Sequence, residues 1–282
     1  MKFIILVLFI FTFTQKSIAQ DVYTLPRTEV IKITDSVSKR VYELHIQKPK
    51  GYTKYKKYPV VYMTDSPYTF PIVVGAARMP INSGRMQKIL FVGISWEEGA
   101  NGSLSRQRDY TPTPSSPGYY GTSGEAAAHL NFIKNDVFSL IENKYSANPI
   151  SKTYIGNSFG GLFGAYILLN SPDTFDNYIL GSPSLWWDDD YMLNKGFENN
   201  KLSADFKGNI FISVGADEIK YANSSNKDMV GVATQFYKKL QALDYKHTNV
   251  ELRITQWANH TTAFPTTAIQ GLWWLLHKDK SQ

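Results

Sequence analysis

The chain has 282 residues, of which 43% are hydrophobic and 14% aromatic, and its formal net charge is +6. This is an ordinary globular composition with enough apolar side chains for a sizeable core. Because the chain has no cysteine, disulfides, thiolate catalysis and cysteine-ligated metals are excluded. Its lysines are scattered apart from one cluster at 48–58, which is typical of a solvated loop rather than of a nucleic-acid-binding face. The net charge favours an anionic ligand only mildly.

The first 19 residues have the pattern of a secretory signal peptide. Lys2 precedes an apolar run from Phe3 to Phe13, and the small residues Ser17 and Ala19 follow it. The apolar run is shorter than a membrane-spanning helix requires. We therefore expect cleavage after Ala19, a periplasmic or secreted location, and no membrane contact of the mature chain.

Strand-like and helix-like segments alternate through the rest of the chain. Residues 30–34 and 39–49 alternate apolar and polar side chains, which is typical of antiparallel strands with one solvated face. Residues 58–65 and 88–96 are continuous apolar runs, as in strands buried on both faces. Residues 97–124 are rich in Gly, Ser, Thr and Pro, and we expect a long loop there.

The second half of the chain continues this alternation. Helices are expected at 124–145, 159–171, 227–243 and 267–278, and strands at 152–157, 177–183, 209–216 and 249–257. An antiparallel start followed by strand-helix alternation predicts one α/β domain over residues 20–282, with a mostly parallel sheet and helices on both of its faces.

Ser158 lies at the centre of a Gly-x-Ser-x-Gly motif, between Gly156 and Gly160. The motif falls where a predicted strand gives way to a predicted helix, which is the context of a nucleophile elbow. We therefore interpret Ser158 as a nucleophile for acyl transfer. The backbone N–H of Phe159, at the helix N-terminus, would donate to the developing oxyanion. The alternative interpretation is a purely structural turn.

A serine nucleophile needs a base, and the base needs an orienting acid. Among the five histidines, His260 is the one that follows the last predicted strand, where the base lies in this chain order. The acid should follow the strand 209–216, where Asp217 and Glu218 are adjacent candidates and Asp228 is a third. Strand geometry does not choose between the two neighbours.

A second oxyanion donor is expected from the segment after the strand 58–65. Pro67 has no N–H and is excluded. Ser66 and Tyr68 are the two candidates, and the sequence does not choose between them.

With these residues placed, the chain resembles the esterase family of α/β-hydrolases, in the branch of siderophore (enterobactin-type) esterases. Feruloyl and acetyl-xylan esterases and S-formylglutathione hydrolase are more distantly similar. The blocks that carry the resemblance are VVYMTDS (60–66), RQRDYTPT (106–113), GNSFGGLFG (156–164), SPSLWW (182–187), VGADE (214–218) and ANHTTAFP (258–265).

The resemblance implies an α/β-hydrolase fold and a serine esterase that works through an acyl-enzyme, with no metal and no cofactor. The substrate would be a small-molecule or glycan ester, with a siderophore ester as the first choice. An acetyl or feruloyl ester of a polysaccharide is the alternative, as is a non-catalytic binding protein of the same fold.

The resemblance also assigns site residues. It favours Glu218 over Asp217 as the acid, because the family's acidic residue is the glutamate of a Gly-x-x-Glu pattern; a serine–histidine dyad is the alternative. Arg108 would border the pocket and pair with an anionic substrate oxygen, or else pair with its neighbour Asp109. For the adjacent aromatic pair we expect one ring against the substrate and one in the core, from Trp186 and Trp187.

Overall fold

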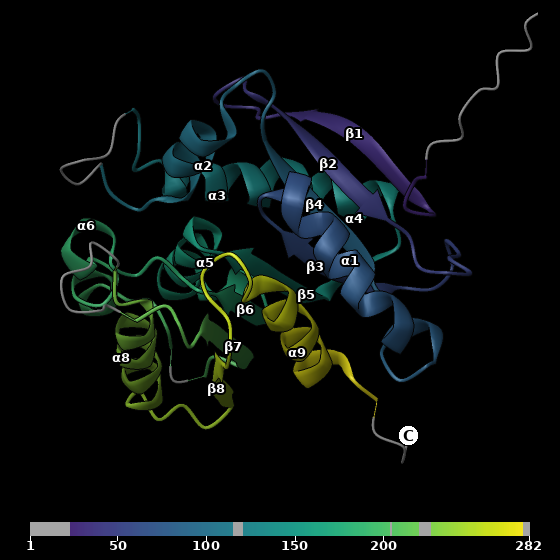
Figure 1. Cartoon of the computed structure of the whole chain (residues 1–282). Coiled ribbons are helices and arrows are strands. Elements are labelled where there is room, and N and C mark those ends of the chain that lie inside the picture. The colour runs from purple at the N-terminus through teal and green to yellow at the C-terminus, as the bar shows by residue number, and fades with distance from the viewer. Residues whose placement is uncertain (1–22, 115–120, 204, 220–226, 279–282) are drawn as a thin grey trace, which may run out of the picture.

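One sheet of eight strands forms the centre of the molecule (Figure 1). The computed structural model of the chain describes residues 23–114, 121–203, 205–219 and 227–278, so the expected signal peptide lies outside the described residues. The strands are β1 (Thr28–Thr34), β2 (Val41–Gln47), β3 (Tyr58–Met63), β4 (Leu90–Glu97), β5 (Ala147–Asn157), β6 (Asn177–Gly181), β7 (Gly208–Gly215) and β8 (Thr248–Thr255). Their order is β1-β2-β4-β3-β5-β6-β7-β8. β2 runs antiparallel to β1 and β4, and the other neighbours are parallel.

Helices cover both faces of this sheet (Figure 1). On one face, α1 (Ser66–Asn82) and α9 (Phe264–Leu276) share a core with β3 to β7. On the other face lie α2 (Gly102–Tyr110), α3 (Ala126–Phe132), the π-helical turn η1 (Ile133–Val137), α4 (Phe138–Lys144), α5 (Phe159–Asn170) and α8 (Met229–Gln241). The short elements are η2 (Pro172–Thr174), α6 (Trp187–Asp190) and α7 (Lys195–Glu198). The α/β class, the antiparallel start and the helices on both faces are therefore confirmed.

The segment 97–124, expected to be a long loop, contains helix α2. The Asn101 side chain caps this helix, because its Oδ1 accepts the N–H groups of Ser103 and Leu104 at 3.0 and 3.2 Å. Such a cap satisfies donors that a helix start leaves unpaired and offsets the poor helix propensity of the first residues. The loop prediction is therefore wrong for residues 102–110.

Helix α1 is missing from the sequence prediction. Pro71 and Pro80 lie inside it, and interior prolines remove helical hydrogen bonds, so they mark a break when only the sequence is considered. The predicted helix 124–145 is also not one regular helix, because η1 separates α3 from α4. In the described part of the chain, no helix is long and apolar enough to cross a bilayer.

Helix α5 packs closely against the sheet because three of its positions are glycine. A Cβ on Gly161 would lie 2.8 Å from the carbonyl oxygen of Gly181, and a Cβ on Gly164 would lie 2.5 Å from Leu180 and Tyr154. Nearly every residue of α5 is buried, as in a helix that is apolar all round. This packing fixes the helix N-terminus beyond the end of β5.

Candidate active site

Ser158 occupies a strained turn between β5 and α5. Its backbone has φ 59° and ψ −118°, a region that residues with a side chain rarely adopt. A Cβ on Gly156 would collide with the carbonyl oxygen of Gly160, and a Cβ on Gly160 would lie 2.6 Å from Thr64 Oγ1. Both glycines of the motif are therefore required by close backbone approach, as expected for a nucleophile elbow.

His260 connects the serine to a buried carboxylate. Its Nε2 lies 3.0 Å from Ser158 Oγ, and its Nδ1 lies 2.6 Å from Glu218 Oε2. Ser158 follows β5, Glu218 follows β7 and His260 follows β8, so all three come from the carboxyl ends of parallel strands. The structure thus brings together the serine, histidine and glutamate that the sequence singled out.

The two adjacent carboxylates differ in their surroundings. Glu218 is 6% exposed, and its Oε1 accepts hydrogen bonds from Ser182 Oγ at 2.6 Å and from the N–H of Gly215 at 2.7 Å. Asp217 is exposed, and its backbone N–H donates to Ala258 O at 3.0 Å. Of the two neighbours, Glu218 is the one that contacts His260.

The third acidic candidate lies away from this chain of contacts. Asp228 caps α8, where its Oδ1 accepts the N–H of Gly231 at 2.8 Å. Its role is therefore that of a helix cap, which is one of the common roles of aspartate.

The segment after β3 contains the two candidates for the second oxyanion donor, the N–H groups of Ser66 and Tyr68. In the part of the chain that the structure describes, only one of them is free of the helix hydrogen bonds of α1. The N–H of Tyr68 donates to Asp65 O at 3.1 Å, and its hydroxyl donates to Asp65 Oδ2 at 3.2 Å. The prediction of Tyr68 as an oxyanion donor is therefore wrong, because its N–H already belongs to the first turn of α1. Ser66 is fully buried at the start of α1 and stays a candidate. Phe159 is the first residue of α5, where helix N–H groups point beyond the N-terminus.

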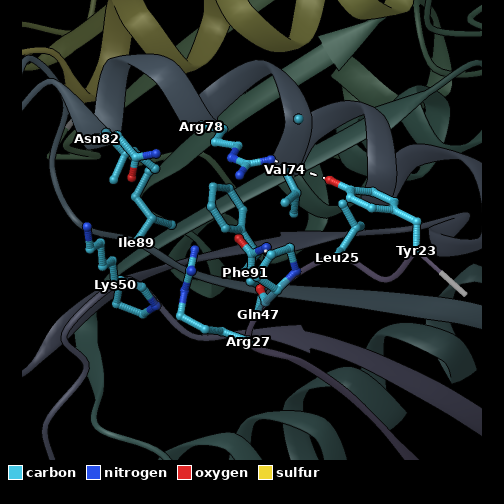
Figure 2. A pocket seen from close by; sticks show the side chains of 14 residues that line it. Tyr23, Leu25, Arg27, Gln47, Lys50, Val74, Arg78, Asn82, Ile89 and Phe91 are labelled. Atoms are coloured by element: carbon cyan, nitrogen blue, oxygen red, sulfur yellow. Dashed lines mark hydrogen bonds between the residues drawn. The ribbon is translucent and has the colours of Figure 1, made fainter. Parts of the chain in front are cut away.

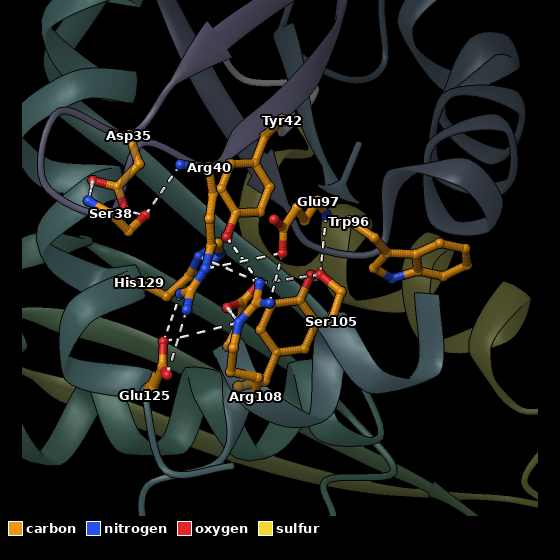
Figure 3. Close-up of polar contacts among 12 residues, drawn as sticks. Asp35, Ser38, Arg40, Tyr42, Trp96, Glu97, Ser105, Arg108, Glu125 and His129 are labelled. Carbon is orange, nitrogen blue, oxygen red and sulfur yellow. Dashed lines mark hydrogen bonds and ion pairs between the residues drawn. The ribbon is translucent and has the colours of Figure 1, made fainter. Parts of the chain in front are cut away.

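Arg108 lies in a buried ionic cluster and not among the residues lining the Ser158 pocket (Figure 3). Its Nε and Nη2 donate to Asp109 at 2.8 and 2.9 Å, and its Nη1 donates to Glu97 Oε2 at 2.6 Å. Burial works against the charged form, but the hydrogen bonds to Asp109 and Glu97 outweigh it and raise the pKa of Arg108 above its usual value. Contact of Arg108 with the substrate is therefore a wrong prediction, and the alternative, pairing with Asp109, is confirmed.

Arg106, two residues earlier on α2, is the arginine next to the nucleophile elbow. It donates two hydrogen bonds to the Asp65 carboxylate, from Nε to Oδ1 at 2.9 Å and from Nη2 to Oδ2 at 3.0 Å. Nη2 also donates to Asn157 O at 3.3 Å, and the guanidinium carbon lies 5.2 Å from the centre of the Phe159 ring. Sequence reasoning missed this residue because the segment was expected to be a loop, whereas on a helix residues two apart point to different faces.

The Asp65 carboxylate accepts hydrogen bonds from several side chains beside the elbow. Asp65 has left-handed backbone geometry at φ 57° and is fully buried. Besides Arg106 and Tyr68, Trp96 Nε1 donates to its Oδ1 at 2.6 Å. A carboxylate that accepts this many hydrogen bonds is well satisfied although it is buried.

The two adjacent tryptophans lie in different places. Trp186 lines a pocket of about 370 Å³ beside Ser158, and Lys227 Nζ lies 5.3 Å from the centre of its ring. Trp187 is fully buried, and its Nε1 donates to Thr113 Oγ1 at 3.0 Å. The structure therefore shows the expected division of the pair, with Trp186 at the pocket and Trp187 in the core.

The pocket holds the groups needed for acyl transfer. Ser158 and His260 line it together with Trp186, Met229 and Ile219. Among the described residues, no group of three or more His, Asp or Glu side chains could hold a metal ion. The arrangement of hydroxyl, imidazole and carboxylate suits attack on a carbonyl carbon by the serine.

Comparison with known proteins shows the family. Residues 36–267 match the family described as "Putative esterase". The ferri-bacillibactin esterase of Bacillus subtilis is 30% identical over 269 residues, which cover 91% of this chain and 92% of the relative. Among solved structures, the BES protein of Bacillus cereus is similar with a TM-score of 0.80 and 25% identity, covering 91% of this chain and 97% of that one.

A more distant structure extends the likeness in fold. The siderophore hydrolase EstA of Aspergillus nidulans has a TM-score of 0.73 and 19% identity, covering 95% of this chain and 98% of that one. The expected fold and the expected siderophore-esterase branch are both confirmed. The chain therefore belongs to the esterase family within the α/β-hydrolases.

Proposed function

We propose that the protein is a serine esterase that hydrolyses the ester bonds of a siderophore through an acyl-enzyme. The observation that carries this proposal is the continuous contact from Ser158 through His260 to Glu218, at 3.0 and 2.6 Å, beside a pocket. The substrate class comes from the relatives, among them a ferri-bacillibactin esterase that spans nearly the whole chain.

In the first half-reaction, Ser158 attacks the ester carbonyl while His260 Nε2 accepts the hydroxyl proton. Glu218, hydrogen-bonded to Nδ1, holds the ring orientation and stabilises the imidazolium that forms. His260 then gives the proton to the departing alcohol. In the second half-reaction, His260 takes a proton from a water molecule that attacks the acyl carbonyl. His260 then returns the proton to Ser158 Oγ as the acyl–serine bond breaks and the carboxylic acid leaves.

The negative charge on the carbonyl oxygen needs donors. The N–H of Phe159 would supply one at the N-terminus of α5, and the N–H of Ser66 would supply the second from the start of α1. Arg106 donates hydrogen bonds to the carbonyl of Asn157 and to the carboxylate of Asp65. It therefore connects the end of β5, which precedes Phe159, with the start of α1, which carries Ser66. It acts as a positioning residue.

The pocket offers the acyl group an aromatic wall. Trp186 provides a flat apolar surface, with the Lys227 ammonium over its ring. An aromatic acyl group would stack on such a surface.

The test is hydrolysis by the wild type and by Ser158→Ala. With a short-chain aryl ester, kcat/KM should fall at least about a hundredfold in the variant, since an intact oxyanion hole leaves some residual rate. Trilactone siderophores, with and without iron, and a feruloyl polysaccharide ester are then compared. Equal activity of the two proteins would refute the mechanism, and a preference for the polysaccharide ester would refute the siderophore assignment.

We also propose that the protein is exported and that the signal peptide is cleaved after Ala19. The support is the order of a charged, an apolar and a small-residue region in the first 19 residues. N-terminal sequencing of the protein from cell fractions should give Gln20 as the first residue outside the cytoplasm. An intact N-terminus there would contradict the assignment.

A further inference from the structure

A second cavity lies on the α1 face of the sheet and shares no residue with the Ser158 pocket (Figure 2). Its volume is about 220 Å³. The walls come from residues 23–27 before β1, from the end of β2, from α1 and from the start of β4. Because β3, β4 and β5 are parallel, the amino end of β4 and the carboxyl end of β5 lie at opposite edges of the sheet. The cavity is therefore remote from the nucleophile.

Three cationic side chains reach this cavity from three segments. Arg27 precedes β1, Lys50 follows β2, and Arg78 lies on α1 (Figure 2). No aspartate or glutamate is among the lining residues. Within the described residues, none of the three cations forms an ion pair with a carboxylate. Like charges gathered without a counter-charge attract an anion.

The two guanidinium groups keep donors for a ligand. Arg27 Nε donates to Lys48 O at 3.1 Å, and Arg78 Nη1 donates to the Tyr23 hydroxyl at 3.5 Å. A guanidinium has five N–H groups, so each arginine retains several donors. Planar, forked donors of this kind match a carboxylate.

The floor of the cavity is apolar. Val74, Ile89 and Phe91 are at most 3% exposed, and Leu25 is half-buried beside them. A cavity of about 220 Å³ suits a single ring or a short chain. A ligand that pairs with these cations and also packs on the apolar floor has one anionic group and a small apolar body.

The open space beside Gly75 is a second indication that this cavity binds a ligand. It lies inside α1 and lines the cavity, and a Cβ added there would meet no atom within 4 Å. A glycine inside a helix costs about 1 kcal/mol relative to alanine. Neither packing nor a positive φ requires this glycine, and its missing side chain leaves the cavity wall open.

We propose that this cavity is a binding site for a small organic monocarboxylate. The carboxylate lies between Arg27 and Arg78, with Lys50 adding to the positive potential, and the apolar body packs on Phe91 and Val74. The proposal is independent of the catalytic assignment, so Ser158→Ala should bind the ligand as the wild type does.

Benzoate is the probe, and benzamide is its neutral control of the same shape. We expect benzoate, titrated by calorimetry to about 10 mM, to bind the Ser158→Ala protein and to raise its midpoint of thermal unfolding, whereas benzamide does neither. Arg27→Gln and Arg78→Gln should each weaken benzoate binding at least about tenfold. Arg85→Gln removes an exposed arginine that does not line the cavity, and it should bind benzoate as the parent does.

Gly75→Leu tests the cavity without changing any charge. The leucine should occupy the open wall and abolish benzoate binding, while the unliganded protein unfolds at the same temperature or higher because helix propensity improves. Met79→Leu, at an exposed position of α1 outside the cavity, is the control that should leave binding intact. Equal binding of benzamide, undiminished binding in Gly75→Leu, or no benzoate binding at 10 mM would each overturn the proposal.

Discussion

Glu218 and Asp217 are neighbours in the chain, yet one is buried and the other is exposed. The turn after β7 directs Glu218 inward, where Ser182, Gly215 and His260 all contact its carboxylate. Asp217 is exposed at the pocket, while its backbone N–H donates to Ala258 O in the loop that carries His260. At the scale of single residues, the orientation of a turn decides which carboxylate can serve the histidine.

Replacing Glu218 by glutamine and Asp217 by asparagine tests which of the two carboxylates serves His260. Glu218→Gln should lower kcat at least about a hundredfold, because the imidazolium loses its counter-charge. Asp217→Asn should lower kcat far less than Glu218→Gln does, because Asp217 lines the pocket while it is Glu218 whose carboxylate contacts His260. Steady-state kinetics with an aryl ester measures both. A larger loss in Asp217→Asn than in Glu218→Gln would reverse the assignment.

Arg106 and Asp65 form a buried pair, and removing one partner leaves the other charge uncompensated. The Arg106 side chain is 17% exposed and that of Asp65 is fully buried. Arg106→Gln should therefore lower the free energy of unfolding by about 3–5 kcal/mol and also lower kcat. Arg106→Gln combined with Asp65→Asn should recover part of the stability.

Denaturant unfolding of the single and double variants measures this coupling. The control is Arg253→Gln, because Arg253 pairs with Glu251 on the surface, where an ion pair contributes at most about 1 kcal/mol. Additive effects of Arg106→Gln and Asp65→Asn would show that the pair is not coupled.

Chain order and motif context located Ser158 and His260, and the structure places them in contact. Arg108, by contrast, is implied only by the family resemblance, and nothing in the sequence singles out Arg106, because a loop gives no rule for which side chain points inward. Once residues 102–110 are known to be helical, the two arginines fall on different faces of α2. Arg106 was therefore missed because helix α2 was not predicted.

At the scale of elements, the start of α5 is fixed by what its glycines touch. Gly156 and Gly160 bring the backbone of the turn against itself and against Thr64, so Ser158 cannot relax to an ordinary conformation. Continuous apolar runs predict β3 and β4, since burial on both faces is a strong sequence signal, and alternation of apolar and polar residues predicts β1 and β2. Helix α1 was hidden by Pro71 and Pro80, whose cost is offset by packing that no sequence pattern displays.

A methyl group at position 160 should disturb the turn. In Gly160→Ala the new Cβ would lie 2.6 Å from Thr64 Oγ1, so the elbow must shift. We expect a loss of about 1–3 kcal/mol in the free energy of unfolding, as for overpacked sites, together with a fall in kcat. Gly75→Ala, where a Cβ has open space, should instead stabilise the protein. Wild-type kcat in Gly160→Ala would show that the elbow tolerates the displacement.

At the scale of the whole molecule, the cluster around Arg108 joins the antiparallel strands to the parallel part of the fold (Figure 3). Arg40 of the turn before β2 pairs with Glu125, and Tyr42 of β2 donates to Asp109 at 3.0 Å. His129 of α3 is buried in the same cluster. Burial lowers the pKa of His129, with Arg108 and Arg40 acting in the same direction and Asp109 and Asp35 acting against it.

This buried histidine should make the protein less stable in mild acid. As the pH falls through about 6.5, the unfolded chain takes up a proton at His129 that the folded protein does not, so the free energy of unfolding decreases by up to about 1.4 kcal/mol per pH unit. His129→Phe removes the titrating group and should flatten the dependence between about pH 7 and pH 5. Urea unfolding at several pH values is the measurement, and an unchanged slope in the variant would contradict the argument.

The last strand has a consequence for how activity arises during synthesis. Ser158 and His260 are 102 positions apart, and β8, which leads to His260, pairs with β7 at the edge of the sheet. A chain still emerging from the ribosome lacks His260, so it cannot complete the proton relay from Ser158 to Glu218 until its final segment docks. C-terminal truncation before β8 should therefore yield a chain without hydrolase activity, because the truncated chain lacks His260.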